Sequence, residues 1–92
     1  MAKYYVQSGW VRLILEARTP RHAAVKAMRW CQDRQAAIFA EPVDERIREA
    51  EILEWQLDDE IIVKETGFES HGGVVFNTIA LAAARTPLVR RT

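Results

Sequence analysis

The sequence has few of the residues from which metal sites, disulfide frameworks and flexible linkers are built. Its 92 residues include one cysteine, two histidines, four glycines and three prolines. A single cysteine excludes an internal disulfide, and Cys31, His22 and His71 lack the paired spacing of a zinc site. The low glycine and proline content argues against extended disorder. We therefore expect one folded domain over residues 1–92, without a metal or cofactor.

Long hydrophobic runs are also missing. No stretch approaches the roughly 18 consecutive apolar residues of a membrane-spanning helix, and residues 1–5 lack the apolar region of a secretory signal. We expect a cytoplasmic protein that has no membrane partner. Cys31 falls in an apolar helical stripe, which predicts a buried, reduced thiol rather than a reactive one.

Catalytic motifs are missing as well. Ser70 stands beside His71, but adjacent loop residues rarely direct their side chains at each other in catalytic geometry, and no Gly-x-Ser-x-Gly context surrounds them. We expect no enzymatic activity. The remaining enzyme hypothesis places a pocket at the loop of residues 65–73, lined by His71 and Glu65.

Basic and acidic residues are concentrated in different segments of the sequence. Residues 1–40 carry seven Lys or Arg and two Asp or Glu, residues 41–70 carry three and eleven, and residues 71–92 carry three and none. The total charge is zero. Segments of opposite sign attract over about 8–10 Å in physiological salt, so the pattern favours contacts between segments and between copies of the chain.

The start of the chain predicts a β-hairpin. Residues 4–6 and 11–17 are rich in β-branched and aromatic side chains, and the Ser8-Gly9 pair between them is a turn signal. In the second strand the odd positions are apolar and are expected to face the core, because side chains alternate along a strand. The opposite face carries Arg12, Ile14 and Glu16.

A helix is predicted directly after the hairpin, at residues 20–37. Thr19 can cap free backbone N–H groups, and Pro20 at the first helical position loses no hydrogen bond. The helical period places four small or apolar side chains on one arc, which we expect to pack on the hairpin: Ala24, Ala27, Met28 and Cys31.

Residues 41–57 support two interpretations. As a helix, the segment has Asp44 as a candidate cap and one apolar arc, which consists of Val43, Ile47, Ala50, Leu53 and Leu57. As a strand, Leu53, Trp55 and Leu57 alternate with polar residues and Ile52. The Glu, Arg and Ala content favours a helix that ends at about residue 54.

The rest of the chain predicts a third strand and a short helix. The strand covers residues 60–66 and ends at Gly67, after which Phe68 is expected to plug the core. Asn77 or Thr78 can cap a helix through residue 84, and residues 88–92 are expected to form a loose basic tail. Together these elements predict an α+β fold in which a small antiparallel sheet has helices on one face.

Two stretches carry a resemblance to known proteins. They are residues 1–9, MAKYYVQSG, and residues 61–68, IIVKETGF. With the strand and the alanine-rich helix between them, they resemble a family of small planctomycete proteins that has no assigned activity. The resemblance covers most of the chain and implies a small domain that stands alone, but it assigns no functional residues.

The tryptophans and the charge pattern together predict a binding role. A thin sheet with one or two helices has little room to bury three tryptophans, and tryptophan is enriched where proteins meet partners. We therefore expect a non-catalytic interaction module whose partner is a protein, including a second copy of itself in an isologous dimer that joins basic and acidic segments. The residues expected to make contact are Trp10, Arg12, Trp30 and Trp55.

The alternative is a regulatory module that binds nucleic acid. Basic residues interleaved with aromatic ones bind phosphates and stack on bases. The candidates in the hairpin and first helix are Arg18, Arg21, Lys26, Arg29 and Arg34. Against this interpretation, an isolated binding domain usually carries net positive charge, whereas this chain carries none.

Overall fold

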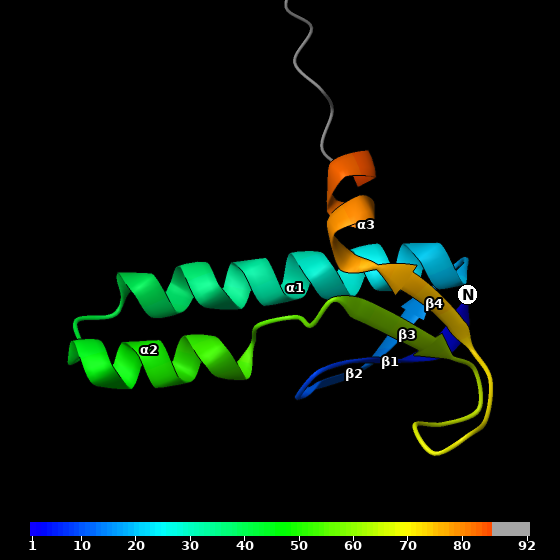
Figure 1. The fold of residues 1–92 in the computed structure, drawn as a ribbon, viewed down its shortest axis with the longest axis horizontal. Coiled ribbons are helices and arrows are strands. Elements are labelled where there is room, and N and C mark those ends of the chain that lie inside the picture. The colour runs from blue at the N-terminus through cyan, green and yellow to red at the C-terminus, as the bar shows by residue number, and fades with distance from the viewer. Residues whose placement is uncertain (86–92) are drawn as a thin grey trace, which may run out of the picture.

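The computed structural model describes residues 1–85, and it confirms the predicted α+β class. The predicted basic tail at residues 88–92 lies outside the described residues. The described residues form four strands and three helices (Figure 1). In chain order these are β1 Ala2–Ser8, β2 Val11–Ala17, α1 Pro20–Ala40, α2 Glu45–Glu54, β3 Glu60–Lys64, β4 Val74–Asn77 and α3 Thr78–Arg85.

The four strands form one antiparallel sheet in the order β2-β1-β3-β4. The predicted hairpin and third strand are present, but β4 was not expected as a strand. Its four residues extend the sheet by pairing with β3, with Ile61 opposite Phe76 and Val63 opposite Val74. Four residues directly before a helix are too few for an alternating pattern that would predict a strand from sequence. The strand forms because these residues pair with β3.

The two layers of the fold are the sheet and the helices α1 and α3, which cover one of its faces (Figure 1). The core between them contains Tyr4 and Val6 from β1, Ile61 and Val63 from β3, and Leu81 from α3. Helix α2 packs beside the far half of α1, beyond the end of the sheet, so that the two helices project together as an arm (Figure 1).

Helix α1 begins as predicted and continues three residues beyond the predicted end at residue 37. The Thr19 Oγ1 accepts a hydrogen bond of 3.0 Å from the His22 N–H, and Pro20 is the first helical residue.

The predicted buried arc of α1 is confirmed. Ala24 and Ala27 are fully buried, as is Ala23, and Met28 and Cys31 are 2% exposed. Alanines have no side chain beyond Cβ, so the helix axis can approach the sheet closely. Leu13 and Leu15 on β2 are half-buried against the same core, which confirms that the odd positions of this strand face the helix.

Within the segment 41–57 the helical interpretation is confirmed for residues 45–54, and Asp44 is the N-cap: the Asp44 Oδ1 accepts a hydrogen bond of 2.8 Å from the Arg46 N–H. The apolar arc is not the face that packs. No residue of α2 is buried, and Ile47 and Leu53 are 52% and 60% exposed. Helix α2 contacts α1 near its C-terminal end, where the Gln35 Nε2 donates to the Ile52 carbonyl.

Phe68 was predicted to plug the core, and this prediction is wrong. Its ring makes an edge-to-face contact with Tyr5, at a centroid distance of 5.3 Å. Tyr5 alternates with the buried Tyr4 and Val6 and therefore lies on the outer face of the sheet. The loop after β3 thus folds Phe68 across the face that the helices leave open.

The close approach of α1 to the sheet gives a first prediction. Replacing Ala24 by leucine adds volume where none is free, so Ala24→Leu should lower the free energy of unfolding by about 1–3 kcal/mol. Ala36→Leu, at an exposed position of the same helix, should leave it nearly unchanged. Urea denaturation measures both, and equal effects of the two substitutions would contradict the packing described here.

Candidate functional site

The tip of the hairpin carries the most exposed aromatic side chain among the described residues. The loop consists of Gly9 and Trp10, and Ser8 belongs to β1 rather than to the turn. Gly9 has a φ of 58°, as expected at the first position of a type II′ turn. The Trp10 side chain is 90% exposed. A structured two-residue turn therefore presents an indole to solvent.

Ser8 holds this tip against the segment that precedes β3. Its side chain is 2% exposed, and its hydroxyl donates to the Glu60 carbonyl at 2.7 Å and accepts from the Asp58 N–H at 2.8 Å. A Cβ on Gly9 would lie 3.4 Å from the Asp58 Cβ. The hairpin tip is thus fixed in position beside the chain that links α2 to β3.

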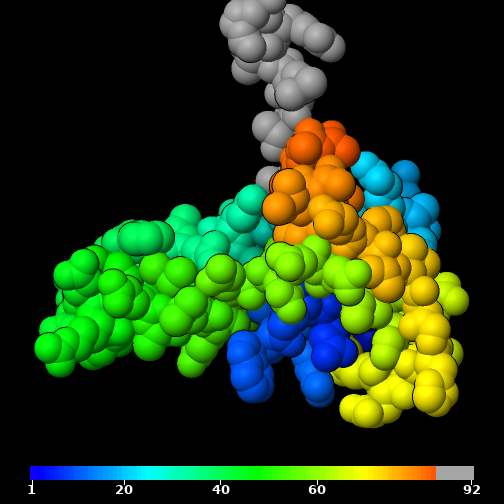
Figure 2. Space-filling view, in the orientation of Figure 1, coloured from blue at the N-terminus to red at the C-terminus, as the bar shows by residue number. Residues whose placement is uncertain are grey.

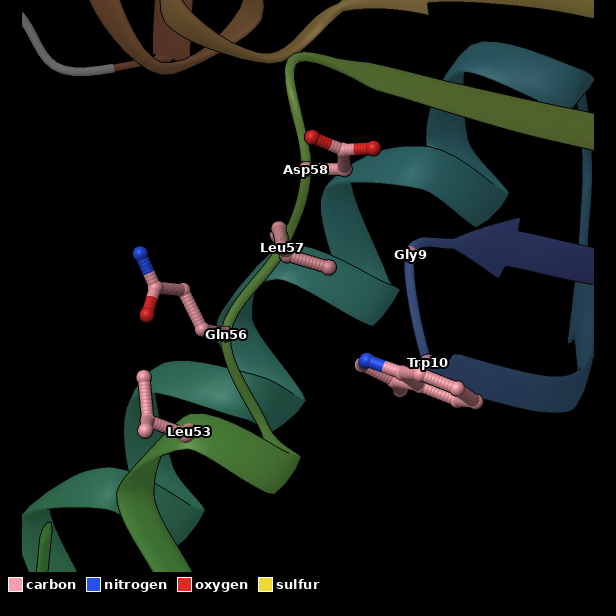
Figure 3. Close-up of a pocket in the computed structure, with 6 residues that line it drawn as sticks. All are labelled: Gly9, Trp10, Leu53, Gln56, Leu57 and Asp58. Carbon is pink, nitrogen blue, oxygen red and sulfur yellow. The ribbon is translucent and has the colours of Figure 1, made fainter. Parts of the chain in front are cut away.

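An open hollow of about 390 Å³ lies between the hairpin tip and the arm. Figure 3 shows Trp10 on one side and the segment from Leu53 to Asp58 on the other, with Gln56 turned away. A second hollow of about 330 Å³ continues from Trp10 along α2, past Leu53, Ala50 and Glu54. Ala50 and Leu53 of the apolar arc therefore form one surface with Trp10, and the space-filling view shows the green arm beside the blue hairpin (Figure 2).

Trp30 and Trp55, two of the predicted contact residues, lie against each other. Their ring centroids are 4.8 Å apart at an interplanar angle of 65°. The guanidinium carbon of Arg34 is 5.9 Å from the Trp30 ring and 5.5 Å from the Trp55 ring, within cation–π range. This cluster joins α1 to α2, and Trp30 keeps 38% of its surface exposed.

The sorted charges meet within one chain at this joint. Arg34 lines a small hollow together with three acidic residues of the middle segment, which are Glu41, Glu51 and Glu54. Basic and acidic side chains of the two oppositely charged segments therefore lie near each other within one chain at this joint.

Arg12, the fourth predicted contact residue, lies on the outer face of the sheet. Its guanidinium carbon is 5.6 Å from the centre of the Phe68 ring. Beside it on β2 is Ile14, 55% exposed, and across the sheet lies Val75, 53% exposed. The predicted contact residues are thus divided among three places: the hairpin tip, the joint of the two helices and the outer face.

Two of the five basic residues of the nucleic-acid hypothesis make contacts within the chain. The Lys26 Nζ donates to the Glu16 carbonyl at 2.6 Å, and the Arg34 guanidinium lies near the rings of two tryptophans. The exposed members are Arg18, Arg21, Arg29 and Arg34.

The loop of residues 65–73 does border a hollow, of about 420 Å³, and both His71 and Glu65 line it. The Ser70 Oγ donates to the Gly67 carbonyl at 2.7 Å. Its proton is therefore directed at the backbone and not at a base, which is not the arrangement of an activated nucleophile.

Two further findings concern the part of the chain that the structure describes. No group of three or more His, Cys, Asp or Glu side chains there is placed to hold a metal ion. None of the helices in residues 1–85 is both long and apolar enough to cross a bilayer.

Comparison with known proteins gave no match among protein-family models, curated proteins or solved structures. The resemblance of residues 1–9 and 61–68 to the planctomycete proteins stays a prediction.

Sequence reasoning named Trp10 but missed its surroundings. The apolar arc of α2 was visible in the sequence, as were the residues of the hairpin. Their meeting depends on how Ser8 ties the tip to Asp58 and Glu60, and a contact between residues about 50 positions apart leaves no periodic signal in either segment.

Cys31 gives a prediction about pH. Burial raises the pKa of its thiol from 9.0 to about 11, because the interior disfavours the thiolate. The folded protein then holds this proton more tightly than the unfolded chain, so the resulting stabilisation is complete below pH 9 and is lost as the pH rises toward 11. The loss should amount to roughly 2–3 kcal/mol.

Cys31→Ala separates this effect from the titration of other groups. The difference in unfolding free energy between wild type and variant, measured by denaturation at several pH values, should narrow or reverse between pH 8.5 and about 11. A difference that stays constant over this range would contradict a buried thiol.

Proposed function

We propose that the protein is a non-catalytic interaction module of the cytoplasm that associates with a second copy of itself. The observation that carries the proposal is the Trp10 side chain, which is 90% exposed although its backbone is fixed in a tight turn. Leaving a large aromatic surface in water is unfavourable, and binding a partner removes that surface from water.

The surroundings of Trp10 support a protein partner. The adjoining side chain of Leu53 is 60% exposed, and Ile47 on the same helix is 52% exposed. Contiguous apolar surface of this kind marks sites where proteins meet other proteins. The zero net charge supports self-association in particular, because two copies experience no net repulsion as they approach.

The rival functions have weaker support. Nucleic-acid binding draws on Arg18, Arg21 and Arg29, but Lys26 and Arg34 are engaged within the chain. An enzyme at residues 65–73 draws on the hollow beside His71, but the only serine there has its hydroxyl on a backbone carbonyl.

Sedimentation equilibrium tests the proposal directly. The wild-type protein should sediment as a dimer at tens of micromolar in moderate salt, and its average mass should fall on dilution. A monomer throughout this concentration range would contradict self-association.

A tryptophan substitution tests the observation that carries the proposal. Trp10→Ser should raise the dissociation constant of the dimer about tenfold, the loss expected when a buried aromatic contact is removed. Ile79→Ser is the matched control, since Ile79 is 75% exposed on α3, away from the hairpin tip. Equal dissociation constants for the Trp10→Ser variant and the wild type would show that Trp10 lies outside the interface.

A further inference from the structure

We propose that the second copy pairs along the free edge of β2, around a two-fold axis through Ile14, so that the two sheets become one. This inference rests on the proposed self-association and names the surface that it uses. The partner is an identical chain, and its strand runs antiparallel to β2, as a two-fold axis requires.

Strand β2 is an edge strand. It lies at the end of the order β2-β1-β3-β4, and within residues 1–85 it pairs only with β1. An edge strand presents a row of unpaired N–H and C=O groups, which is a template for another strand. The seven residues of β2 offer a longer edge than the four residues of β4.

The register of the whole sheet shows which groups of β2 point outward. The Thr78 N–H donates to the Asp59 carbonyl, and in antiparallel sheets hydrogen-bonded pairs alternate with pairs that are not bonded. Carried from β4 to β3, then to β1 and β2, this alternation makes Ser8 and Val11 a bonded pair. The odd residues of β2 therefore bond to β1, and the even residues direct their N–H and C=O groups to the open edge.

Two hydrogen bonds at the end of β2 agree with this assignment. The carbonyl of Glu16 accepts from the Lys26 Nζ at 2.6 Å, and the N–H of Arg18 donates to the His22 Nδ1 at 3.3 Å. Both groups belong to even residues and both point away from β1. Among the described residues, the backbone groups of Arg12 and Ile14 have no partner across this edge.

Charge selects the register of the pairing. An axis through Ile14 sets Arg12 opposite Glu16 of the second copy, and by symmetry Glu16 opposite Arg12, so both cross-strand pairs join opposite charges. An axis through Arg12 or through Glu16 would set like charges opposite each other. An axis through Leu15 would set Arg12 opposite Arg18. An axis through Leu13 would set Arg12 opposite Ile14 and Glu16 opposite Trp10, so neither charge would gain an opposite charge.

The register through Ile14 also matches the direction of the backbone groups. It pairs even residues with even residues, and those are the residues whose N–H and C=O groups face the edge. The Glu16 carbonyl already accepts from Lys26, but a carbonyl oxygen has a second lone pair for the N–H of Arg12.

The same register covers the apolar groups that the single chain leaves exposed. Ile14, 55% exposed, meets Ile14 of the second copy on the axis. Leu13, half-buried at the edge of the core, comes opposite Leu15. Trp10 comes opposite Arg18, where a guanidinium can cover the exposed indole. The pairing thus accounts for the exposed tryptophan on which the proposed function depends.

Charge reversal tests the register with two variants and their mixture. Arg12→Glu places two acidic strands opposite each other, and Glu16→Arg places two basic strands opposite each other, so each variant alone should have a dissociation constant raised about tenfold or more. An equimolar mixture should form a heterodimer at least as tight as the wild-type dimer, because both cross-strand pairs are again opposite in charge. Sedimentation equilibrium measures all three.

Matched controls make the same charge changes elsewhere. Arg29→Glu on the exposed face of α1 and Glu49→Arg on α2 should leave the dissociation constant unchanged, and circular dichroism confirms that every variant folds. All four positions are exposed, so the fold should tolerate the substitutions.

The outcomes separate this inference from the proposed function. A wild-type dimer that persists in both charge variants, or two weakened variants that do not recover on mixing, would overturn pairing through the β2 edge and leave self-association standing. A wild-type monomer would overturn both. The two-fold register through Ile14 is supported if each variant alone dimerises weakly and the mixture of the two dimerises tightly.

Discussion

Close packing of the alanine face of α1 on the first strands is the constraint on which the rest of the structure depends. Ala23, Ala24 and Ala27 are fully buried against a core that includes Tyr4 and Val6. Larger side chains would hold the helix farther from the sheet and leave voids that cost stability. One long helix, reinforced by Leu81 from α3, therefore supplies the second layer of the fold on a single face of the sheet.

Because the helices cover one face of the sheet, several other surfaces remain outside the core. Because α1 runs past the end of the sheet, its far half packs on α2, and the Trp30, Arg34 and Trp55 cluster joins the two helices there. On the outer face of the sheet, Phe68 lies against Tyr5 and Arg12. The edge of β2 and the indole of Trp10 remain in solvent. The proposed association would thus use groups of the hairpin that folding leaves exposed.

Sequence reasoning succeeded where the signal is local. The Thr19-Pro20 helix start, the Asp44 cap, the alternation along β2 and the alanine arc are each set by neighbours within one or two turns, and the structure contains all of them. It failed where distant segments decide the outcome. Phe68 is apolar and follows a glycine, but only the position of Tyr5 shows which face it covers. The short β4 and the hollow beside Trp10 likewise depend on pairings that no single segment encodes.

Hydrogen exchange of the β2 amides, followed by NMR at low and high protein concentration, tests this account most directly. The amides of Leu13 and Leu15 face β1 and should be protected at every concentration. The amides of Arg12 and Ile14 should exchange rapidly in dilute solution and become protected as the second strand pairs. Unprotected Leu13 and Leu15 amides, or an Ile14 amide whose exchange does not slow as the concentration rises, would contradict the account.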